Sequence, residues 1–268
     1  MLNQTFQQAK CAGGRILMFT LSLFFALSTS AVYSQHPQQQ WAEPVAGIKV
    51  LPIFHASLEL KAAGKTILVD PSFDTGLLDW IEDPDLILLT DIHGDHMDAD
   101  ILNRINTRFG NKTIIAPKAV KEALPPELRP HIKVLANGQS TSLDGVSIQA
   151  VPMYNLPDAS QMFHPKGRGN GYILTVNGKK VYLSGDTEAT PELRSLKGIN
   201  LAFICMNLPY TMDVKQAAEG VLDFKPEVVI PYHYKGGDGL SDIHLFKKLV
   251  EAGHKPIKVE LLDFYPAD

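Results

Sequence analysis

The chain has 268 residues, of which 45% are hydrophobic and 20% are charged, which excludes a wholly disordered or fibrous protein and predicts a folded domain with a buried core. The 25 basic and 29 acidic residues give a formal net charge of −4, and no long run of Lys or Arg occurs, so nucleic acid is not an expected partner. The two cysteines, Cys11 and Cys205, are too few for a disulfide scaffold or a Cys-rich zinc module, so a bound metal would be held by His and carboxylate side chains.

The first 34 residues have the layout of a secretory signal peptide. Two basic residues and no acidic residue precede an apolar run over residues 16–27, and small residues then lead to a candidate cleavage site before Gln35. An uncleaved membrane anchor is the alternative, but the run is shorter than the roughly 20 residues that a helix needs to cross a bilayer. We expect the leader to be removed, a periplasmic or secreted location, and contact with a membrane only through an uncleaved leader.

Residues 35–46 are polar and rich in Gln and Pro, so they are expected to form a tether. The folded domain is expected to begin near Gly47 and to extend to residue 268. Short runs of apolar and β-branched residues predict strands over residues 48–54, 58–60, 66–69, 85–89, 113–116, 132–135, 146–151, 172–176, 180–183, 200–204, 227–230 and 257–261.

Helices are predicted between these strands. The first begins after the N-cap candidate Asp98 and places several apolar residues on one face, and others are predicted over residues 118–123, 213–223 and 241–252. The order indicates a fold of the α/β (α+β) class. Two sheets packed face to face with helices outside would fit this order, and so would one doubly wound sheet; hydrophobic periodicity does not distinguish them.

A dense group of metal-ligand side chains follows the predicted strand at residues 85–89. Asp91, His93, Asp95 and His96 lie within six positions, where the curved backbone of a loop between a strand and a helix can turn them toward one point. A lone His is more often a surface residue, but four ligand types at the end of one buried strand are not expected by chance. The segment therefore predicts a metal site.

At this point the chain resembles the metallo-β-lactamase superfamily, whose first signature is H-x-H-x-D-H on such a loop. Gly185-Asp186-Thr187 resembles the G-D-T signature of the family, and His233 resembles its final His ligand. His55 and Asp70 are similar to the opening hairpin of the branch that contains L-ascorbate-6-phosphate lactonase and N-acylphosphatidylethanolamine phospholipase D. The resemblance implies a four-layer αββα sandwich with the ligands at one edge.

The resemblance also implies how the ligands are shared between two ions. Asp186 would bridge them, and the remaining candidates are Asp91, His93 and His164 for the first ion, and Asp95, His96 and His233 for the second. Zinc is the expected cofactor, with manganese and iron as alternatives and one or two ions per chain.

Two departures from the family pattern concern the first ion. Asp91 stands where the family usually has its first His, and this harder oxygen ligand would favour manganese or iron or weaken the site. The family usually has a third His at the end of the strand before the G-D-T signature, but here Tyr154 is followed by Asn155. A subset of the branch resembles this chain in carrying Phe-His-Pro-Lys-Gly further on, which makes His164 the candidate replacement. The alternatives are that His164 only donates or accepts hydrogen bonds, and that Asn155 or solvent completes the site.

Two ions sharing a hydroxide would supply the nucleophile, so no Ser, Cys or Lys nucleophile is required. Asp95, Tyr210 and His55 are the candidate catalytic residues, although packing beside the metal would also explain Tyr210. The Gly-rich loop around Lys166 and Arg168 would attract an anion or lie free in solvent. The candidate substrate-binding residues are Tyr154, Asn155, Lys166, Tyr210 and Tyr234.

The expected function is that of an exported metal-dependent hydrolase. It would cleave an ester, lactone, amide or phosphodiester bond in a small-molecule or lipid-like substrate, and the sequence does not identify that substrate. The first alternative is an iron redox protein, but the flavin domain of that branch has no room in this chain. The second is a catalytically weak metal-binding or sensor protein of the same fold.

Overall fold

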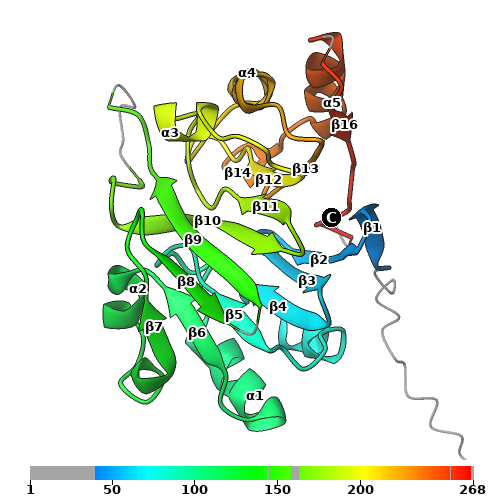
Figure 1. Cartoon of the computed structure of the whole chain (residues 1–268). Coiled ribbons are helices and arrows are strands. Elements are labelled where there is room, and N and C mark those ends of the chain that lie inside the picture. Colours follow the sequence, from blue (N-terminus) through cyan, green and yellow to red (C-terminus); the bar gives the residue numbers. More distant parts are fainter. Residues whose placement is uncertain (1–39, 144, 158–162, 254, 267–268) are drawn as a thin grey trace, which may run out of the picture. The chain divides into compact units, whose positions relative to one another are not determined.

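The computed structural model describes residues 40–143, 145–157, 163–253 and 255–266 (Figure 1). The predicted leader lies outside these residues. Strands β1 to β7 form one seven-stranded sheet in chain order. They are β1 Ala42–Val45, β2 Ile48–Phe54, β3 Ser57–Ala62, β4 Lys65–Val69, β5 Leu86–Leu88, β6 Thr113–Ala116 and β7 Ile132–Val134.

The second seven-stranded sheet has the order β16-β13-β12-β11-β10-β9-β8. Its strands are β8 Ser140–Leu143, β9 Val146–Met153, β10 Gly169–Val176, β11 Lys179–Leu183, β12 Leu201–Cys205, β13 Val228–Tyr232 and β16 Lys258–Val259. A short hairpin of β14 Lys235–Gly236 and β15 Gly239–Leu240 follows β13.

Helices cover the outer faces of both sheets. They are α1 Ala99–Phe109, α2 Lys118–Ala123, α3 Pro191–Arg194, α4 Val214–Phe224 and α5 Ile243–Ala252, and the 3-10 turns are Thr75–Asp79 and Arg129–His131. In β5, Ile87 packs with α1 and α2, whereas Leu86 and Leu88 pack toward the second sheet. This alternation is the period of two that a strand between two apolar layers requires. The four-layer αββα sandwich is confirmed.

Several elements differ from the sequence predictions. Strand β1 lies within the stretch expected to be a tether and pairs with β2, so the first sheet begins before Gly47. Strand β8, helix α3 and the β14–β15 hairpin were not predicted, because short polar segments carry no periodic apolar pattern. Helix α5 is capped by Asp242, whose carboxylate accepts from the backbone of His244 and Leu245, and begins at Ile243.

The topology brings the candidate ligands to one edge. Strands β4, β5 and β6 are parallel in one sheet, and β11, β12 and β13 are parallel in the other, so their carboxyl ends point the same way within each sheet. The two sheets are tied at this edge by the Tyr172 hydroxyl, which donates to Leu89 O at 2.9 Å, and by Asn170 N, which donates to Thr90 O at 2.9 Å. Among the described residues, no helix is long and apolar enough to cross a membrane.

Candidate metal centre

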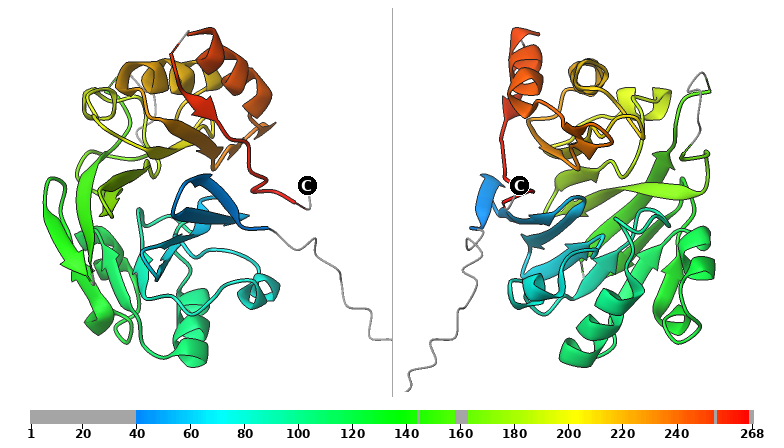
Figure 2. Two further views of the ribbon diagram at one scale, coloured as in Figure 1. Left: turned by 45° about the vertical axis from the view of Figure 1, so that its right-hand side comes forward. Right: turned by 180° about the vertical axis from the view of Figure 1, so that it is seen from behind.

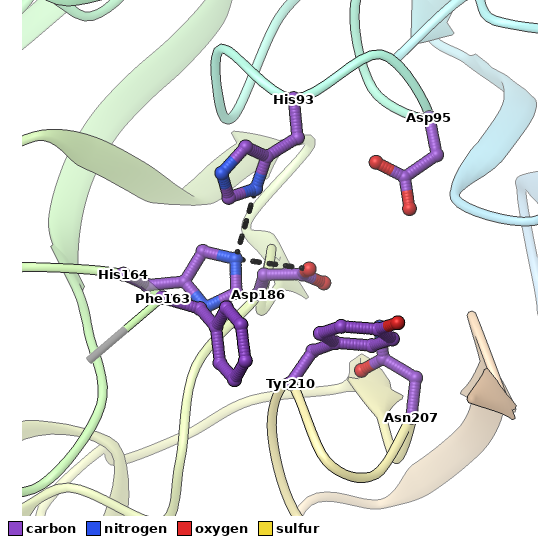
Figure 3. A pocket seen from close by; sticks show the side chains of 7 residues that line it. All are labelled: His93, Asp95, Phe163, His164, Asp186, Asn207 and Tyr210. Carbon is purple, nitrogen blue, oxygen red and sulfur yellow. Dashed lines mark hydrogen bonds and ion pairs between the residues drawn. The ribbon is translucent and has the colours of Figure 1, made fainter. Parts of the chain in front are cut away.

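The structure gathers all seven predicted metal ligands at the strand-end edge. Three sets have ligand atoms within 4.8 Å of one another. They are Asp91 with His93 and His164, His96 with Asp186 and His233, and His55 with Asp95 and His233. Figure 3 shows four of these side chains, His93, Asp95, His164 and Asp186, around one cavity. We call the set containing Asp91, His93 and His164 the first half-site, and Asp95, His96, Asp186 and His233 the second half-site.

His96 is oriented for metal binding by a buried carboxylate. Its Nδ1 lies 2.9 Å from Asp70 Oδ2, and because a carboxylate only accepts hydrogen bonds, the ring proton is on Nδ1. In the neutral ring, which is the form that binds a metal, the lone pair is therefore on Nε2, a buried atom with no hydrogen-bond partner among the described residues. A carboxylate behind a His is the arrangement that fixes the tautomer of a metal ligand. Asp70 was associated with the resemblance but not with the predicted site.

Asp186 belongs to the second half-site and also faces the first. One oxygen, Oδ2, is 3.3 Å from His96 Nε2 and 3.2 Å from His164 Nε2, and the other, Oδ1, is 3.3 Å from His233 Nε2. The carboxyl is buried, and its Oδ1 also lacks a hydrogen-bond partner in the part of the chain that the structure describes. Buried polar atoms left unpaired are costly unless a ligand satisfies them. His96 Nε2 and Asp186 Oδ1 thus fit a divalent ion.

Asp95 completes the second half-site from the solvent side. Its side chain is 42% exposed, with Oδ2 3.4 Å and Oδ1 3.9 Å from the Nε2 atoms of His233 and His96 respectively. Burial opposes ionisation of Asp95, but the hydrogen bond from His233 and the charge of His96 outweigh it and hold its pKa well below the ordinary value. In turn, Asp186 and Asp95 raise the pKa of His233 to about 9 against the effect of burial. Without an ion, this half-site therefore holds protons that an ion would displace.

Asn155 orients His164 rather than occupying a ligand position. The backbone N–H of His164 donates to Asn155 Oδ1 at 2.6 Å, and His164 Nδ1 lies 3.2 Å from the same oxygen. The Asn155 amide nitrogen donates to Tyr210 O at 2.9 Å, which fixes the orientation of the amide. His164 therefore carries its ring proton on Nδ1, and its Nε2 lone pair faces Asp186 and His93. Of the sequence alternatives, this geometry favours His164 as the group available to a metal.

Asp91 is fully buried and carries a salt bridge that sequence reasoning missed. Arg168 Nη2 lies 3.0 Å from Asp91 Oδ2, and Arg168 Nε lies 3.2 Å from Oδ1. His93 Nδ1 is 2.8 Å from the same Oδ2. Burial opposes ionisation, but the hydrogen bond from His93 and the electrostatic effect of the neighbouring His96 and Arg168 side chains lower the pKa of Asp91. The only sequence signal for Arg168 was its position in a Gly-rich loop with a second cation.

His55 lies behind His233. Its Nδ1 is 3.4 Å from His233 Nδ1 and 3.1 Å from the Tyr265 hydroxyl, and its backbone O accepts from His233 N. Burial and the neighbouring His233 lower the pKa of His55 to about 4. These contacts orient His233, and the catalytic role given to His55 stays a prediction. Figure 2 shows the C-terminal segment that contains Tyr265, in red, beside the first strands of the first sheet, in blue.

The cavity at the centre has a volume of about 190 Å³. It is lined by His93, Asp95, Phe163, His164, Asp186, Asn207 and Tyr210 (Figure 3). The rings of Phe163 and Tyr210 pack edge to face with centroids 5.1 Å apart, and they lie across the cavity from His93 and Asp95 (Figure 3). Among the described residues, those that line this cavity include no Lys or Arg. Phe163 and Asn207 were not among the predicted site residues.

Of the five residues predicted to bind substrate, only Tyr210 lines this cavity. The Tyr154 hydroxyl donates to Glu192 at 2.7 Å, and Lys166 pairs with the same carboxylate while its Nζ lies 4.5 Å from the centroid of the Tyr154 ring. Tyr234 packs its ring against Tyr265. These contacts brace neighbouring loops, and substrate binding by Tyr154, Lys166 and Tyr234 stays a prediction.

Comparison with known proteins agrees with this geometry. A family model for the beta-lactamase superfamily domain matches residues 52–233. Two relatives named as metal-dependent hydrolases, from Pyrococcus abyssi and Thermococcus onnurineus, are each 34% identical, with 76% of this chain and 92% of the relative covered.

Two solved structures are similar in fold and sequence. A protein from Parabacteroides distasonis, described as a metal-dependent hydrolase, is 35% identical with a TM-score of 0.68, covering 81% of this chain and 94% of that one. A metallo hydrolase from the archaeon Ignicoccus hospitalis is 25% identical with a TM-score of 0.67, covering 81% and 95%. Because the family model spans most of the chain and the relatives align over most of their own length, this chain belongs to the metallo-β-lactamase superfamily and is a metal-dependent hydrolase of that fold.

Proposed function

We propose that the protein hydrolyses an uncharged carboxylic ester or lactone, with zinc, or alternatively manganese or iron, bound by the second half-site. The observation that carries this proposal is the lining of the central cavity, where the aromatic pair of Phe163 and Tyr210 lies across from the candidate ligands His93 and Asp95. An apolar acyl or alkyl group would pack against this aromatic pair. A phosphodiester anion would meet carboxylates and no Lys or Arg among the described lining residues, which disfavours that substrate class.

The ligand set has the composition of a hydrolytic metal site. A divalent ion held there would lower the pKa of water and polarise a carbonyl oxygen. Asp95 is ionised and its carboxylate faces the cavity, so its oxygens can accept the proton of the attacking water. Asn207 accepts from Thr211 through Oδ1, which leaves its Nδ2 as a donor 3.2 Å from His233 Nε2 and beside the cavity. That Nδ2 would orient the substrate carbonyl, while Phe163 and Tyr210 exclude water from its apolar part.

A substrate panel tests the proposal directly. Protein loaded with zinc, manganese or iron would be assayed with p-nitrophenyl acetate, butyrate and octanoate, δ-valerolactone, nitrocefin and bis-p-nitrophenyl phosphate. We expect turnover of esters or lactone above that of the phosphodiester, and a raised KM for butyrate in Phe163→Ala and Tyr210→Ala. Arg104→Ala, an exposed site on α1, is the matched surface control.

Two results would contradict this assignment. Faster turnover of the phosphodiester than of the esters and the lactone would show that the substrate is a phosphoryl compound and not an ester. Metal binding without turnover of any member of the panel would instead support the sensor alternative, in which the fold binds metal without catalysis.

Export is a separate proposal, which rests on the sequence of the leader alone. N-terminal sequencing of protein recovered from the periplasm or medium of a bacterium that expresses the full chain should begin at or close to Gln35. Protein that keeps Met1 and stays in the cytosol would contradict export without affecting the hydrolase assignment.

A further inference from the structure

The first half-site is closed by hydrogen bonds that leave its ligand atoms satisfied. Arg168 has only donors, so its contact of 3.3 Å with His93 Nε2 places a lone pair on that nitrogen. The ring proton of His93 is then on Nδ1, which points to Asp91 Oδ2 at 2.8 Å and to His164 Nε2 at 3.2 Å. That proton occupies the space between the three atoms that would otherwise bind the first ion.

Arg168 therefore acts on both residues that the H-x-H part of the family signature would supply. It holds the Asp91 carboxylate through two parallel hydrogen bonds, and it holds His93 in the tautomer that directs a proton, not a lone pair, into the half-site. Two parallel hydrogen bonds are the strong and geometrically specific form of an Arg–carboxylate pair. The side chain of Arg168 is 21% exposed, and that of Asp91 is 0% exposed.

The backbone is shaped to place this pair. Arg168 immediately precedes β10, which begins at Gly169 and contacts the loop that follows β5 through the hydrogen bond from Asn170 N to Thr90 O. A Cβ at Gly169 would lie 2.9 Å from Thr90 O and 3.2 Å from Asp91 Oδ1, so only glycine allows this close approach. The same loop that brings His164 into the site therefore brings a guanidinium against Asp91.

Charge balance indicates what the whole site can hold. Asp91 is neutralised by Arg168, and Asp70 is held by the ring proton of His96. Asp95 and Asp186 pair with the imidazole rings of His96 and His233, whose protons an ion would displace, so these two carboxylate charges become available to one divalent ion. We propose that the guanidinium of Arg168 is the resident cation of the first half-site, so that the protein binds one divalent ion tightly, in the second half-site.

Metal stoichiometry tests this inference without reference to activity. The chelated full chain would be titrated with Zn²⁺ by calorimetry, and its metal content after dialysis would be measured by inductively coupled plasma mass spectrometry. We expect one tight ion per chain. Two ions of similar affinity in the unaltered protein would overturn the proposal whatever the variants show.

Variants at Arg168 then separate charge from structure. Arg168→Met should raise the number of tightly bound zinc ions per chain from one toward two. Asp91 loses its cation in this variant, and His93 can turn the lone pair of Nδ1 toward the first ion. Arg168→Lys keeps a positive charge and should stay at one ion. The double variant Asp91→Asn with Arg168→Met removes both charges, avoids an unpaired buried carboxylate and should also hold one ion.

Two variant results would overturn the proposal. A single ion in folded, zinc-titrated Arg168→Met would show that Arg168 does not exclude the first ion. Two ions in the double variant would show that the carboxylate of Asp91 is not the group that Arg168 competes for. If Arg168→Met does not fold, the stoichiometry of the unaltered protein still decides.

Discussion

The two half-sites use the same kinds of side chain but leave them in opposite states. In the second half-site, Asp70 directs the free Nε2 of His96 toward Asp186, and buried ligand atoms have no hydrogen-bond partner among the described residues. In the first, Arg168 and the Nδ1 proton of His93 satisfy the corresponding atoms. The partner behind a ligand, and not the ligand alone, therefore decides whether a carboxylate and two imidazoles are prepared for a metal ion.

Removal of one His from each half-site should give the largest difference in zinc affinity between two matched variants. His96→Ala should lower zinc affinity by more than about 100-fold, beyond the range of an outer-shell change, because a direct ligand is lost. The matched variant His93→Ala should keep the tight ion. Calorimetric titration of both variants checks this, and equal loss of zinc from both would show that the half-sites bind as one unit.

Asp91→Asn should affect folding more than metal content. Breaking a buried ion pair while one charge remains typically costs about 3–5 kcal/mol, although the partial exposure of Arg168 places this site at the lower end. Urea unfolding of the ion-free protein measures that loss, and zinc titration should still give one tight ion. A variant with unchanged stability but no bound zinc would instead identify Asp91 as a direct ligand.

Asp70→Asn should weaken zinc binding without emptying the site. The carboxylate that fixes the His96 tautomer is lost, and changes of this kind cost about 10–100-fold in affinity. Asp85→Asn, at an exposed carboxylate of the same sheet, is the control. Unchanged zinc affinity in Asp70→Asn would remove the proposed distinction between the half-sites.

The smallest expected effect is a pH dependence confined to the ion-free protein. The pKa of His233 rises from 6.5 to about 9 on folding, so its stabilising effect is complete below about pH 6.5 and is lost as the pH rises through about 9. Burial raises the pKa of Glu59 from 4.5 to about 8, so Glu59 also makes the folded state less stable as the pH rises. The measurement is therefore made in the Glu59→Gln variant, which removes this second contribution. Thermal unfolding should show a falling Tm above pH 6.5 without zinc and a weaker dependence with zinc; the same slope in both forms would contradict this explanation.

The sequence predicted the parts of the site that follow from local patterns. Strand β2 and helix α2 were placed with correct bounds because each is a continuous apolar or amphipathic run. The candidate ligands could be found because each directly follows a buried strand or carries a family signature. The Asp91–Arg168 pair could not, because 77 residues separate its members and a cation in a Gly-rich loop has many possible partners. Tyr265 was missed for the same reason, since it reaches His55 across 210 residues.

The contact between His55 and Tyr265 also bears on the order in which the protein folds. Asp70 and His96 are 26 residues apart in sequence, whereas His55 is 178 residues from His233 and 210 from Tyr265. Contacts between distant segments carry a larger loop-closure entropy and form later in folding than local ones. The Asp70–His96 pair should therefore form before His233 is fixed in place. Metal binding by the second half-site should then appear only after the contact between His55 and His233 has formed, so zinc uptake would report the completion of the native state.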